Sequence, residues 1–283
     1  SHNGRIHADI NQIRSDDGGT VTGRFSMSNP NLQQIPVRHK ELGPLIRSLF
    51  IPEENNKWGV FDYSQQEPRI LIHYAKLQRL DGINEIADAY KEGNADFHSA
   101  VAKMAGIERS QAKTINLGLM YGMGKNKLMA ELGLMKEAAE KLIAQYHAKA
   151  PFIKQLMQAV SRRADESGRI RTLGGRVCHF DLWEPTTFGA GFPKTHAEAI
   201  KEYGHGIKRA GTYKALNRLI QGSAADMTKL SIIALSEAGI VPHIQIHDEL
   251  DISVESDEHA KQIVEIMESS IKLEIPNKVD YEF

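Results

Sequence analysis

The sequence predicts an α+β fold, and three observations support this prediction. Two short runs with alternating apolar residues, 58–64 and 244–250, are typical of strands, and each carries an aspartate. Between them, residues from about 69 to 165 follow the period of amphipathic helices, with breaks at glycines and before Pro151. Strands are thus expected towards both ends of the chain and helices in its middle, a distribution typical of the α+β class.

The remaining elements follow in order along the chain. Residues 1–64 are rich in Gly, Asn and Pro and predict short strands and loops. After the helical stretch, residues 168–177 predict a β-hairpin, and residues 181–211 contain glycines and aromatic residues without a clear period. The last predicted elements are a helix over 212–238, two strands around His247, a helix over 259–273 and a C-terminal strand.

The composition fits a globular protein. With 283 residues, 41% of them hydrophobic and 25% charged, the chain can bury a full core in one large domain or two closely joined domains. The net charge of -1 and the pI near 6.9 count against a nucleic-acid partner, although local charge decides binding more than the total does. Basic residues do cluster, which predicts a basic groove or, as the alternative, solvated helix faces: Arg162, Arg163, Arg169, Arg171, Arg176, Lys208, Arg209, Lys214 and Arg218.

Cysteine content and apolar runs limit the cellular setting. The single Cys178 excludes an internal disulfide framework and fits a reducing compartment. No apolar stretch approaches the ~20 residues of a membrane span, and the first residues lack the apolar core of a signal peptide. The chain starts as if in the middle of a domain and stops inside a strand pattern, so we expect a portion of a longer polypeptide.

Two strand ends that each present an acid predict a site for divalent cations. Asp62 closes the first strand-like run, and Asp248 and Glu249 stand side by side after the second. Mg²⁺ takes few protein carboxylates and completes its shell with water and substrate phosphates. Two such acids are what a protein needs to hold a pair of hard divalent cations.

A basic helix lies between the two acids in the sequence. Within residues 108–122, Arg109, Lys113, Leu117 and Tyr121 are spaced four apart and form one slightly spiralling stripe about 18 Å long. The stripe grades from cationic to apolar to aromatic. This order suits a nucleoside triphosphate, with phosphates on the cations, sugar against the leucine and base near the tyrosine. For the stripe taken alone, an amphipathic helix with two solvated charges is the stronger interpretation.

Several segments together resemble the palm and fingers of a family A DNA polymerase, in the order that this family uses. They are residues 22–36, the segment 62–69 that contains Asp62, the helix 108–122 and the triplet His247-Asp248-Glu249. Residues 217–226 also resemble the primer-template helix of that family. The resemblance runs almost from end to end of the chain, and the motifs are specific because they occur together.

The resemblance implies a particular form of the α+β fold, in which an antiparallel palm sheet carries the catalytic acids and a helical fingers subdomain is inserted. Residues 1–74 would form the first part of the palm with the end of the thumb-palm junction, 75–165 the fingers, and 166–283 the second part of the palm. A thumb and any exonuclease domain would lie N-terminal to residue 1. The stretch at about 181–211 resembles insertions in phage-type enzymes, and a surface loop without a particular role is the alternative.

The resemblance also implies an activity and its cofactor. The chain would be a template-directed DNA polymerase that adds deoxynucleoside triphosphates to a primer 3′-end with two Mg²⁺ ions, for which Mn²⁺ can substitute. The metals would be held by Asp62, Asp248 and the backbone carbonyl of Tyr63, and Lys113 would donate a proton to pyrophosphate. Glu249 is expected to face the opposite side of the strand from Asp248, which makes it a poorer ligand.

Further site residues follow from the same resemblance. Nucleotide binding is expected at a basic, aromatic and polar set comprising Arg109, Lys113, Leu117, Tyr121, His98, Gln65 and Glu67. DNA binding at the primer end or the minor-groove edge is expected at Arg24, Asn217, Gln221 and His247. Without the resemblance, such polar residues would be taken for surface residues and helix caps. The implied partners are primer-template DNA and deoxynucleotides, with no membrane, in the cytoplasm of a bacterium or phage-infected cell; an organelle is also compatible.

Two residues depart from the family pattern. Pro68 follows Glu67 in place of an aliphatic residue and fits only if a helix starts there. Leu117 stands in place of an aromatic residue against the sugar, so speed and sugar selection are expected to be atypical. A single-subunit RNA polymerase is one alternative function, against which Glu67 argues because it would fill the space of a 2′-hydroxyl. A catalytically silent nucleic-acid-binding module is another.

Overall fold

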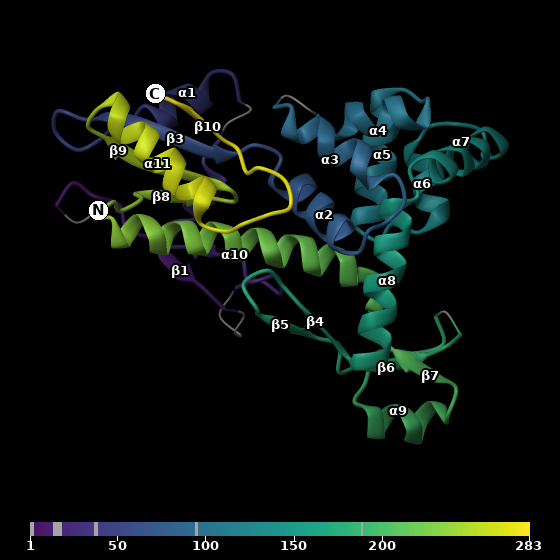
Figure 1. Cartoon of the computed structure of the whole chain (residues 1–283). Coiled ribbons are helices and arrows are strands. Elements are labelled where there is room, and N and C mark those ends of the chain that lie inside the picture. Colours follow the sequence, from purple (N-terminus) through teal and green to yellow (C-terminus); the bar gives the residue numbers. More distant parts are fainter. Residues whose placement is uncertain (1–2, 14–18, 37–38, 94–95, 188) are drawn as a thin grey trace. The chain divides into compact units, whose positions relative to one another are not determined.

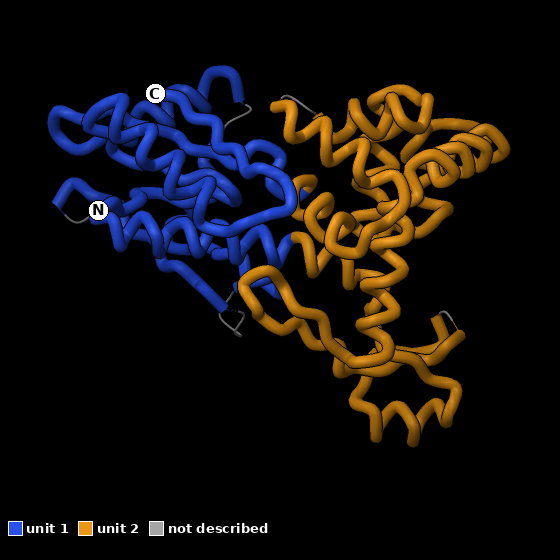
Figure 2. The backbone as a smooth tube through the Cα atoms, in the orientation of Figure 1, with its two compact units in different colours: residues 1–67, 221–283 blue, residues 68–220 orange. Residues whose placement is uncertain are grey.

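The computed structural model describes residues 3–13, 19–36, 39–93, 96–187 and 189–283. The chain divides into two compact units, of which unit 1 consists of residues 1–67 and 221–283 and unit 2 of residues 68–220 (Figure 2). Unit 2 is therefore continuous in the sequence, whereas unit 1 is assembled from both ends of the chain. No helix among the described residues is long and apolar enough to cross a lipid bilayer.

Unit 1 is built on a four-stranded antiparallel sheet with the strand order β10-β3-β9-β8 (Figure 1). Its strands are β3 (Lys57–Tyr63), β8 (Ile244–Ile246), β9 (Glu249–Val254) and β10 (Val279–Glu282). These bounds confirm the predicted strand at 58–64, the two strands around His247 and the C-terminal strand.

The two central strands of this sheet bury alternate side chains, as the pleat of a β-strand requires. Phe61 and Tyr63 of β3 and Leu250 and Ile252 of β9 are at most 2% exposed. Asp62 lies between the two buried residues of β3 and points to the other face of the sheet. The alternation thus separates an apolar face, which packs in the core, from an acidic face.

Two long helices pack with the apolar face, namely α10 (Ala215–Glu237) and α11 (Asp257–Ser269). The hydroxyl of Tyr63 joins both of them, because it forms a hydrogen bond of 2.6 Å with Ser231 Oγ and donates to the carbonyl of Met267 at 2.5 Å. Burial raises the pKa of Tyr63, so the phenol stays protonated and remains a donor. Two helices therefore hold the strand that carries Asp62, through hydrogen bonds on the apolar face of the sheet.

The N-terminal part of unit 1 contains short elements, as its glycines and prolines predict. β1 (Asp9–Asn11) pairs antiparallel with β2 (Ser26–Ser28), and a 3₁₀ turn, η1 (Leu32–Gln34), follows. The helix α1 (Leu42–Arg47) was not predicted, since its sequence contains a glycine and a proline. Pro44 is nevertheless tolerated, because it occupies the first turn, where backbone N–H groups have no helical acceptor.

Helices dominate unit 2, in agreement with the predicted helical stretch. They are α2 (Gln66–Leu77), α3 (Ile83–Lys91), α4 (Phe97–Ala105), α5 (Arg109–Met120), α6 (Lys125–Glu131), α7 (Lys136–Lys149) and α8 (Phe152–Ser167). Their core includes Phe97, Ile115, Tyr146 and Phe152, all fully buried. Pro68 lies in the first turn of α2, as its sequence position requires.

The predicted hairpin at 168–177 is confirmed as β4 (Arg169–Arg171) paired with β5 (Val177–His179). Gly168 turns the chain from α8 into β4 with a φ of +69°, and an added Cβ would lie 2.8 Å from the guanidinium of Arg209. Arg209 donates 3.0 Å hydrogen bonds to the carbonyls of Asp165 and Phe180. It thereby ties the end of α8 to the strand that follows the hairpin.

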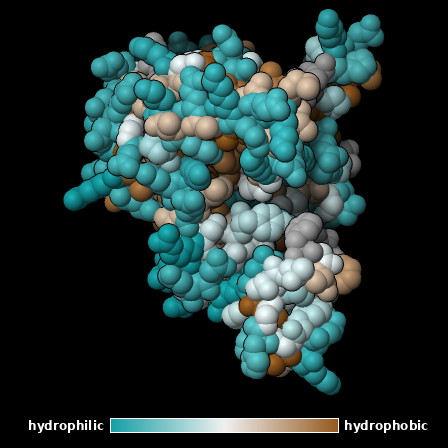
Figure 3. All heavy atoms as spheres, turned by 90° about the vertical axis from the view of Figure 1, so that its right-hand side faces the viewer, coloured by the Kyte–Doolittle hydropathy of each residue, from teal (hydrophilic) through white to brown (hydrophobic). Residues whose placement is uncertain are grey.

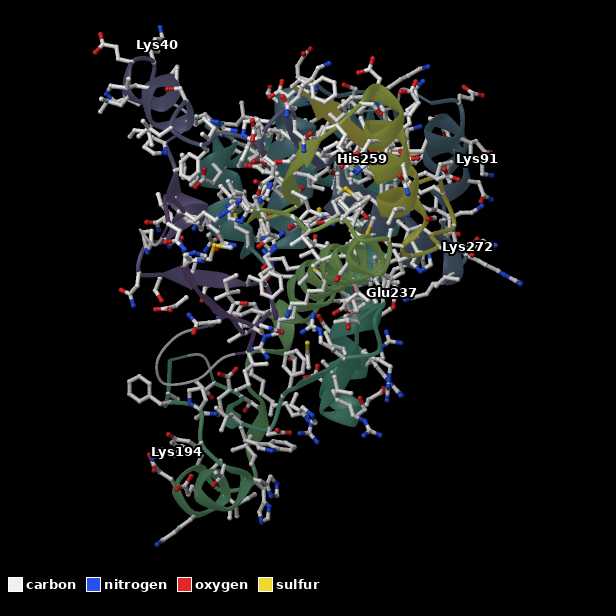
Figure 4. All side chains as sticks on the ribbon, turned by 90° about the vertical axis from the view of Figure 1, so that its left-hand side faces the viewer. Lys40, Lys91, Lys194, Glu237, His259 and Lys272 are labelled. Atoms are coloured by element: carbon white, nitrogen blue, oxygen red, sulfur yellow. The ribbon has the colours of Figure 1, made fainter. Side chains whose placement is uncertain are left out.

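The stretch 181–211 has regular structure of its own, which its sequence did not predict. β6 (Trp183–Pro185) pairs antiparallel with β7 (Ile207–Arg209), and α9 (His196–Tyr203) lies between them in the chain. Lys194, labelled in Figure 4, exchanges backbone hydrogen bonds of 2.7 and 2.9 Å with Trp183, and its side chain forms an ion pair with Glu202. The stretch is therefore a small folded appendage of unit 2.

Unit 2 ends with a 3₁₀ turn, η2 (Thr212–Lys214), that leads directly into α10. The predicted helix over 212–238 is thus confirmed except for its first turn, which follows Gly211 in a left-handed conformation. The molecular face drawn in Figure 3 is mainly hydrophilic, and its apolar residues occur in small scattered groups. Scattered apolar residues are usual on a protein surface and indicate no partner by themselves.

Candidate active site

The acidic residues of unit 1 gather at one end of the sheet. Asp62 pairs across the ladder with Glu249 on one side and with Asp280 on the other, and cross-strand partners share a face. Asp248 lies in the tight turn between β8 and β9, where His247 has a left-handed φ of +56°. The carbonyl of Asp248 accepts a 3.4 Å hydrogen bond from the N–H of Tyr63, which ties this turn to the end of β3.

The carboxylates of this acidic cluster repel one another. Desolvation, together with the neighbouring carboxylates of Asp248, Glu249 and Asp280, raises the pKa of Asp62 to about 7. Desolvation also raises the pKa of Asp248, against the opposing effects of its own backbone N–H, Arg24 and His247. Like charges that lie so close favour either protons or a metal ion.

The premise of the expectation for Glu249, that it lies in one strand with Asp248, does not hold. Alternation predicted that Glu249 would face away from Asp248, but Asp248 precedes β9 and lies in the turn, so the strand rule does not apply to this pair. Glu249 shares a face with Asp62 instead. Burial raises the pKa of Glu249 and that of Asp251 beside it, and each retains a buried oxygen without a hydrogen-bond partner, Glu249 Oε1 and Asp251 Oδ1.

These residues fit a hard divalent cation, because the available donors are carboxylate oxygens, some of them unpaired. Within the described part of the chain, no group of three or more His, Cys, Asp or Glu residues is arranged as a complete metal site. Mg²⁺ commonly uses one or two carboxylates and takes its other ligands from water and phosphates. Asp62 and Asp248 meet that requirement.

The acidic cluster is bordered by polar residues that hold one another. Arg24 Nη2 donates to Glu67 Oε1 at 2.7 Å, in a pair whose side chains are 26% and 17% exposed. Gln33 donates to the side-chain oxygen of Gln245 at 3.0 Å, and Gln245 donates to the carbonyl of His247 at 2.5 Å. The latter chain of bonds supports the turn that carries Asp248. Gln33 and Gln245 were not predicted as site residues.

Unit 2 presents the predicted stripe on α5, whose bounds confirm the helix expected over 108–122. Lys113 and Tyr121 are exposed and Leu117 is half-buried, whereas the opposite face of α5 is buried. Gly122 follows the end of the helix with a φ of +67°, and an added Cβ there would lie 2.7 Å from the carbonyl oxygen of Tyr213. Only glycine fits this close approach.

Arg109 is exposed but already paired. Its Nε and Nη2 donate to the two carboxylate oxygens of Asp96 at 2.9 and 3.1 Å, in the bidentate geometry that is strongest for arginine. Asp96 is also the N-cap of α4 and accepts from Ser99 N at 2.8 Å. Burial acts to raise the pKa of Asp96, but the hydrogen bonds from Arg109 and Ser99 outweigh it and hold the pKa at about 2.

His98 is oriented by a buried polar chain. The hydroxyl of Tyr146 donates to Asn116 Oδ1, so the amide nitrogen of Asn116 faces His98 Nδ1 at 2.9 Å. Because that nitrogen donates, Nδ1 of His98 accepts, and the ring proton is placed on Nε2. Burial lowers the pKa of His98, and Arg109 and Lys113 lower it further while Asp96 opposes them. His98 is thus a neutral donor through Nε2.

The predicted DNA-binding residues on α10 lie on one face of that helix. Asn217 and Gln221 are one turn apart, and both are half-buried. Arg218, next to Asn217, donates to the carbonyl of His179 at 3.2 Å and stacks over Phe180 at 4.7 Å. Gln65 precedes α2 with a left-handed φ of +53°.

Apart from Asn217 and Gln221 on α10, where the division between the units falls, the predicted site residues form two groups, one in each unit. Unit 1 brings together Asp62, Tyr63, Asp248, His247, Arg24, Gln65 and Glu67, and unit 2 brings together His98, Arg109, Lys113, Leu117 and Tyr121. Two supporting residues of unit 2, Asn116 and Tyr146, were missed. The signal for Asn116 was present, since an amide on the otherwise apolar face of a helix requires a buried partner.

Comparison with known proteins gives a consistent result. The model of DNA polymerase family A matches residues 1–283. A "DNA-directed DNA polymerase" of Pseudomonas phage M6 is 37% identical over 99% of this chain and 46% of its own length. A "DNA polymerase I, thermostable" of Thermus filiformis is 32% identical over 98% of this chain and 32% of its own length.

A solved structure agrees in fold. The POL domain of Pol1 from M. smegmatis, in complex with DNA primer-template and dNTP, superposes with a TM-score of 0.77 at 28% identity, over 99% of this chain and 48% of that chain. The chain thus spans less than half the length of these relatives.

Proposed function

Because this chain belongs to DNA polymerase family A, we propose that it carries the nucleotidyl-transfer site of a template-directed DNA polymerase that extends a primer 3′-end with deoxynucleoside triphosphates. The observation that carries the proposal is the meeting of Asp62, Asp248 and Glu249 at one end of the sheet. The phage and bacterial relatives support DNA rather than RNA synthesis. They also support action in the cytoplasm of a bacterium or a phage-infected cell.

In this proposal, Asp62, Asp248 and the backbone carbonyl of Tyr63 hold two divalent cations. Mg²⁺, or Mn²⁺ in its place, would lower the pKa of the primer 3′-hydroxyl and neutralise charge on the triphosphate. The carboxylates supply hard oxygen ligands, and the anchored Tyr63 side chain keeps the strand that bears Asp62 in place.

Residues of unit 2 bind the triphosphate. Lys113 is exposed and offers an ammonium group that can contact phosphate and donate a proton to the leaving pyrophosphate. Neutral His98 adds a directed N–H from Nε2. Arg109 can contribute positive charge near the phosphates without moving. Its guanidinium group donates to Asp96, so a direct phosphate contact would require these hydrogen bonds to be shared with the phosphate or broken. Leu117 and Tyr121 would face sugar and base.

The remaining polar residues would contact primer and template. Arg24, Asn217, Gln221 and His247 carry side chains that can bind phosphates or minor-groove acceptors, which occur in every base pair and therefore permit binding without sequence selection. Gln65 and Glu67 would adjoin the incoming nucleotide. The Arg24–Glu67 ion pair fixes the carboxylate that we propose to exclude a 2′-hydroxyl.

A Mg²⁺-dependent primer-extension assay tests the proposed function. Asp62→Asn and Asp248→Asn should each reduce nucleotide addition by more than about a thousandfold, because several kcal/mol of metal-mediated charge stabilisation is lost. Primer-template affinity should stay within a few-fold. Asp280→Asn is a matched control, since Asp280 flanks Asp62 on β10 but is not assigned as a ligand.

Extension at nearly the wild-type rate by either aspartate variant would overturn the assignment of the metal ligands. A wild-type protein that binds primer-template but extends no primer would instead indicate a silent binding module. Preference for ribonucleotides would indicate an RNA polymerase.

A further inference from the structure

A cavity of about 290 Å³ opens in unit 2, and none of the site residues assigned above lines it. Arg163 at the end of α8 and Arg169 and Arg171 on β4 line it, together with Tyr74 and Gln78 of α2. All three arginines are exposed. Arg169 and Arg171 alternate with the buried Ile170, so they share one face of their strand.

The arginines of this region divide into two kinds. Arg209 and Arg218 are used internally, because each donates to a backbone carbonyl and stacks on an aromatic ring. Arg163 and Arg169, in contrast, make no side-chain hydrogen bond or ion pair with any residue that the structure describes. Arg171 donates only to the carbonyl of Gly175, at 3.1 Å.

The local charge is unbalanced in a chain that is nearly neutral overall. Residues 159–178 contain five arginines and two carboxylates, whereas the whole chain has 35 basic and 36 acidic residues. Three guanidinium groups around one cavity repel one another, and no carboxylate among the described residues forms an ion pair with any of them. A bound anion would relieve this repulsion, and guanidinium forks suit phosphate oxygens best.

The apolar lining and the size of the cavity limit the kind of anion that can bind there. Apolar residues, including Val160 and Leu219, also line the cavity, and Tyr74 supplies an aromatic ring. A volume of about 290 Å³ lies at the lower end of small-ligand pockets and suits one nucleotide, not a duplex. Arginine-bound phosphates beside an apolar and aromatic lining are the features of sites for single-stranded nucleic acid.

We infer that this arginine cavity, formed by Arg163, Arg169 and Arg171 with Tyr74, binds the phosphodiester backbone of unpaired DNA, with one base against its apolar lining. The inference rests on the proposed function and deepens it, since it adds a contact for a single strand to the residues assigned to the primer-template. The site belongs entirely to unit 2.

The test measures binding of a fluorescein-labelled oligo(dT) by anisotropy, in the complete protein and in EDTA, over a series of KCl concentrations. The variant Arg163→Gln/Arg169→Gln should bind about tenfold more weakly at 0.1 M KCl. The slope of log K against log salt should become shallower by about 1.4, because each contact between a cation and a phosphate of a single strand contributes about 0.7.

The matched control is Lys149→Gln/Lys154→Gln, which removes two exposed charges outside the cavity. It should keep the wild-type slope. Arg163→Lys/Arg169→Lys should keep the slope but lose part of the affinity, because charge remains and the guanidinium fork does not. All exchanged residues are exposed, and unchanged thermal unfolding would show that the fold is intact.

Equal affinity of the cavity variant and its control would overturn the inference. Loss of binding to free deoxynucleotide with unchanged oligo(dT) binding would overturn it as well, because the cavity would then serve a nucleotide and not a strand. EDTA prevents nucleotide addition, so the binding result stands whether or not the protein extends primers. Failure of this inference is therefore distinguishable from failure of the proposed function.

Discussion

Asn116 is the residue whose role is most easily overlooked, because it lies inside the protein and touches no substrate. Its Oδ1 accepts a hydrogen bond from the hydroxyl of Tyr146, and its amide nitrogen donates to Nδ1 of His98. Both partners lie far from it in sequence, which is why sequence reasoning identified His98 but not the residues that orient it. The buried Asn116 therefore decides which ring nitrogen of His98 carries the proton, and hence whether Nε2 can donate to a phosphate.

Exchange of Asn116 should therefore alter binding of the triphosphate. Asn116→Asp places a carboxylate against Nδ1 of His98, favours protonation of the ring and should raise the pKa of His98, which burial now lowers. The NMR titration of His98 should move to higher pH, and the KM for deoxynucleotide should acquire a new pH dependence in the same range.

Asn116→Leu is the companion variant. It leaves the Tyr146 hydroxyl and His98 Nδ1 without partners and should cost about 1–3 kcal/mol of stability. A wild-type pH profile of KM in the aspartate variant would show that Asn116 only fills space.

Glu67 offers a second prediction at a single residue. Glu67→Ala should raise ribonucleotide incorporation relative to deoxynucleotide by about tenfold or more, because the space for a 2′-hydroxyl opens. Glu67→Gln keeps the volume and loses the ion pair with Arg24, so it separates size from charge. Competition between the two nucleotides on one primer measures the ratio. An unchanged ratio in the alanine variant would remove Glu67 from the sugar site.

The acids themselves could be predicted, since each closes a strand with clear alternation. The direction in which Glu249 points relative to Asp248 could not be predicted, because it depends on whether Asp248 belongs to the strand or to the turn. A left-handed His247, which is uncommon for a residue other than glycine, settles that in favour of the turn. The conformation of His247 thus decides that Asp248 lies in the turn and that the strand begins at Glu249.

Among the elements, the joint between α4 and α5 depends on charge. Asp96 caps α4 and pairs with Arg109 at the start of α5, and its pKa of about 2 lies below the ordinary value of 3.8. A depressed pKa means that the stabilisation is complete above the ordinary value and is lost as the pH falls towards the folded value.

Asp96→Asn should therefore destabilise unit 2 at neutral pH, with a difference from wild type that is constant above about pH 5 and shrinks between about pH 4 and 2. Urea midpoints at a series of pH values measure this difference. A pH-independent difference would mean that the helix cap, which asparagine retains in part, is all that Asp96 provides.

Sequence patterns located the long elements well and the short ones poorly. α5, α10 and the strands β3, β8 and β9 have clear periods and were predicted within a few residues. α1 and α9 were missed, because six and eight residues are too few to show a helical period and the first contains both glycine and proline. Short elements are defined by their tertiary partners.

The appendage formed by β6, α9 and β7 allows a prediction that concerns this group of elements. Pro185 and Ile207 are direct partners in the ladder, so residues 186–206 can be replaced by Asn-Gly in a two-residue hairpin turn. Trp183 and Arg209 remain, and with them the bonds of Arg209 to Asp165 and Phe180. Unit 2 should then unfold within a few degrees of wild type in calorimetry.

Primer extension by the shortened protein decides what the appendage does. Retained extension is expected, because the assigned residues lie elsewhere in the chain. Loss of extension with an unchanged melting temperature would show instead that the appendage takes part in the reaction.

At the scale of the whole molecule, the site residues are distributed over two units of different construction. The acids belong to the unit built from both ends of the chain, and the basic stripe belongs to the unit between them. The family resemblance could predict this distribution because its motifs are spread along the chain in a fixed order. The arginine cavity could not be predicted as a site, because it requires the helix end, the hairpin and α2 to be placed in space.

The split construction of unit 1 affects the order in which the protein can fold during synthesis. β3 is made well before its ladder partners, because β9 begins 186 residues and β10 216 residues after the end of β3. Unit 2 is translated in full during that interval and has all its own partners. During that interval β3 has no partner strand and its apolar side chains are not covered. An unpaired apolar strand is prone to pair with the wrong segment. The late C-terminal segment therefore completes the nascent acidic site, and a stalled or truncated translation product would lack it entirely.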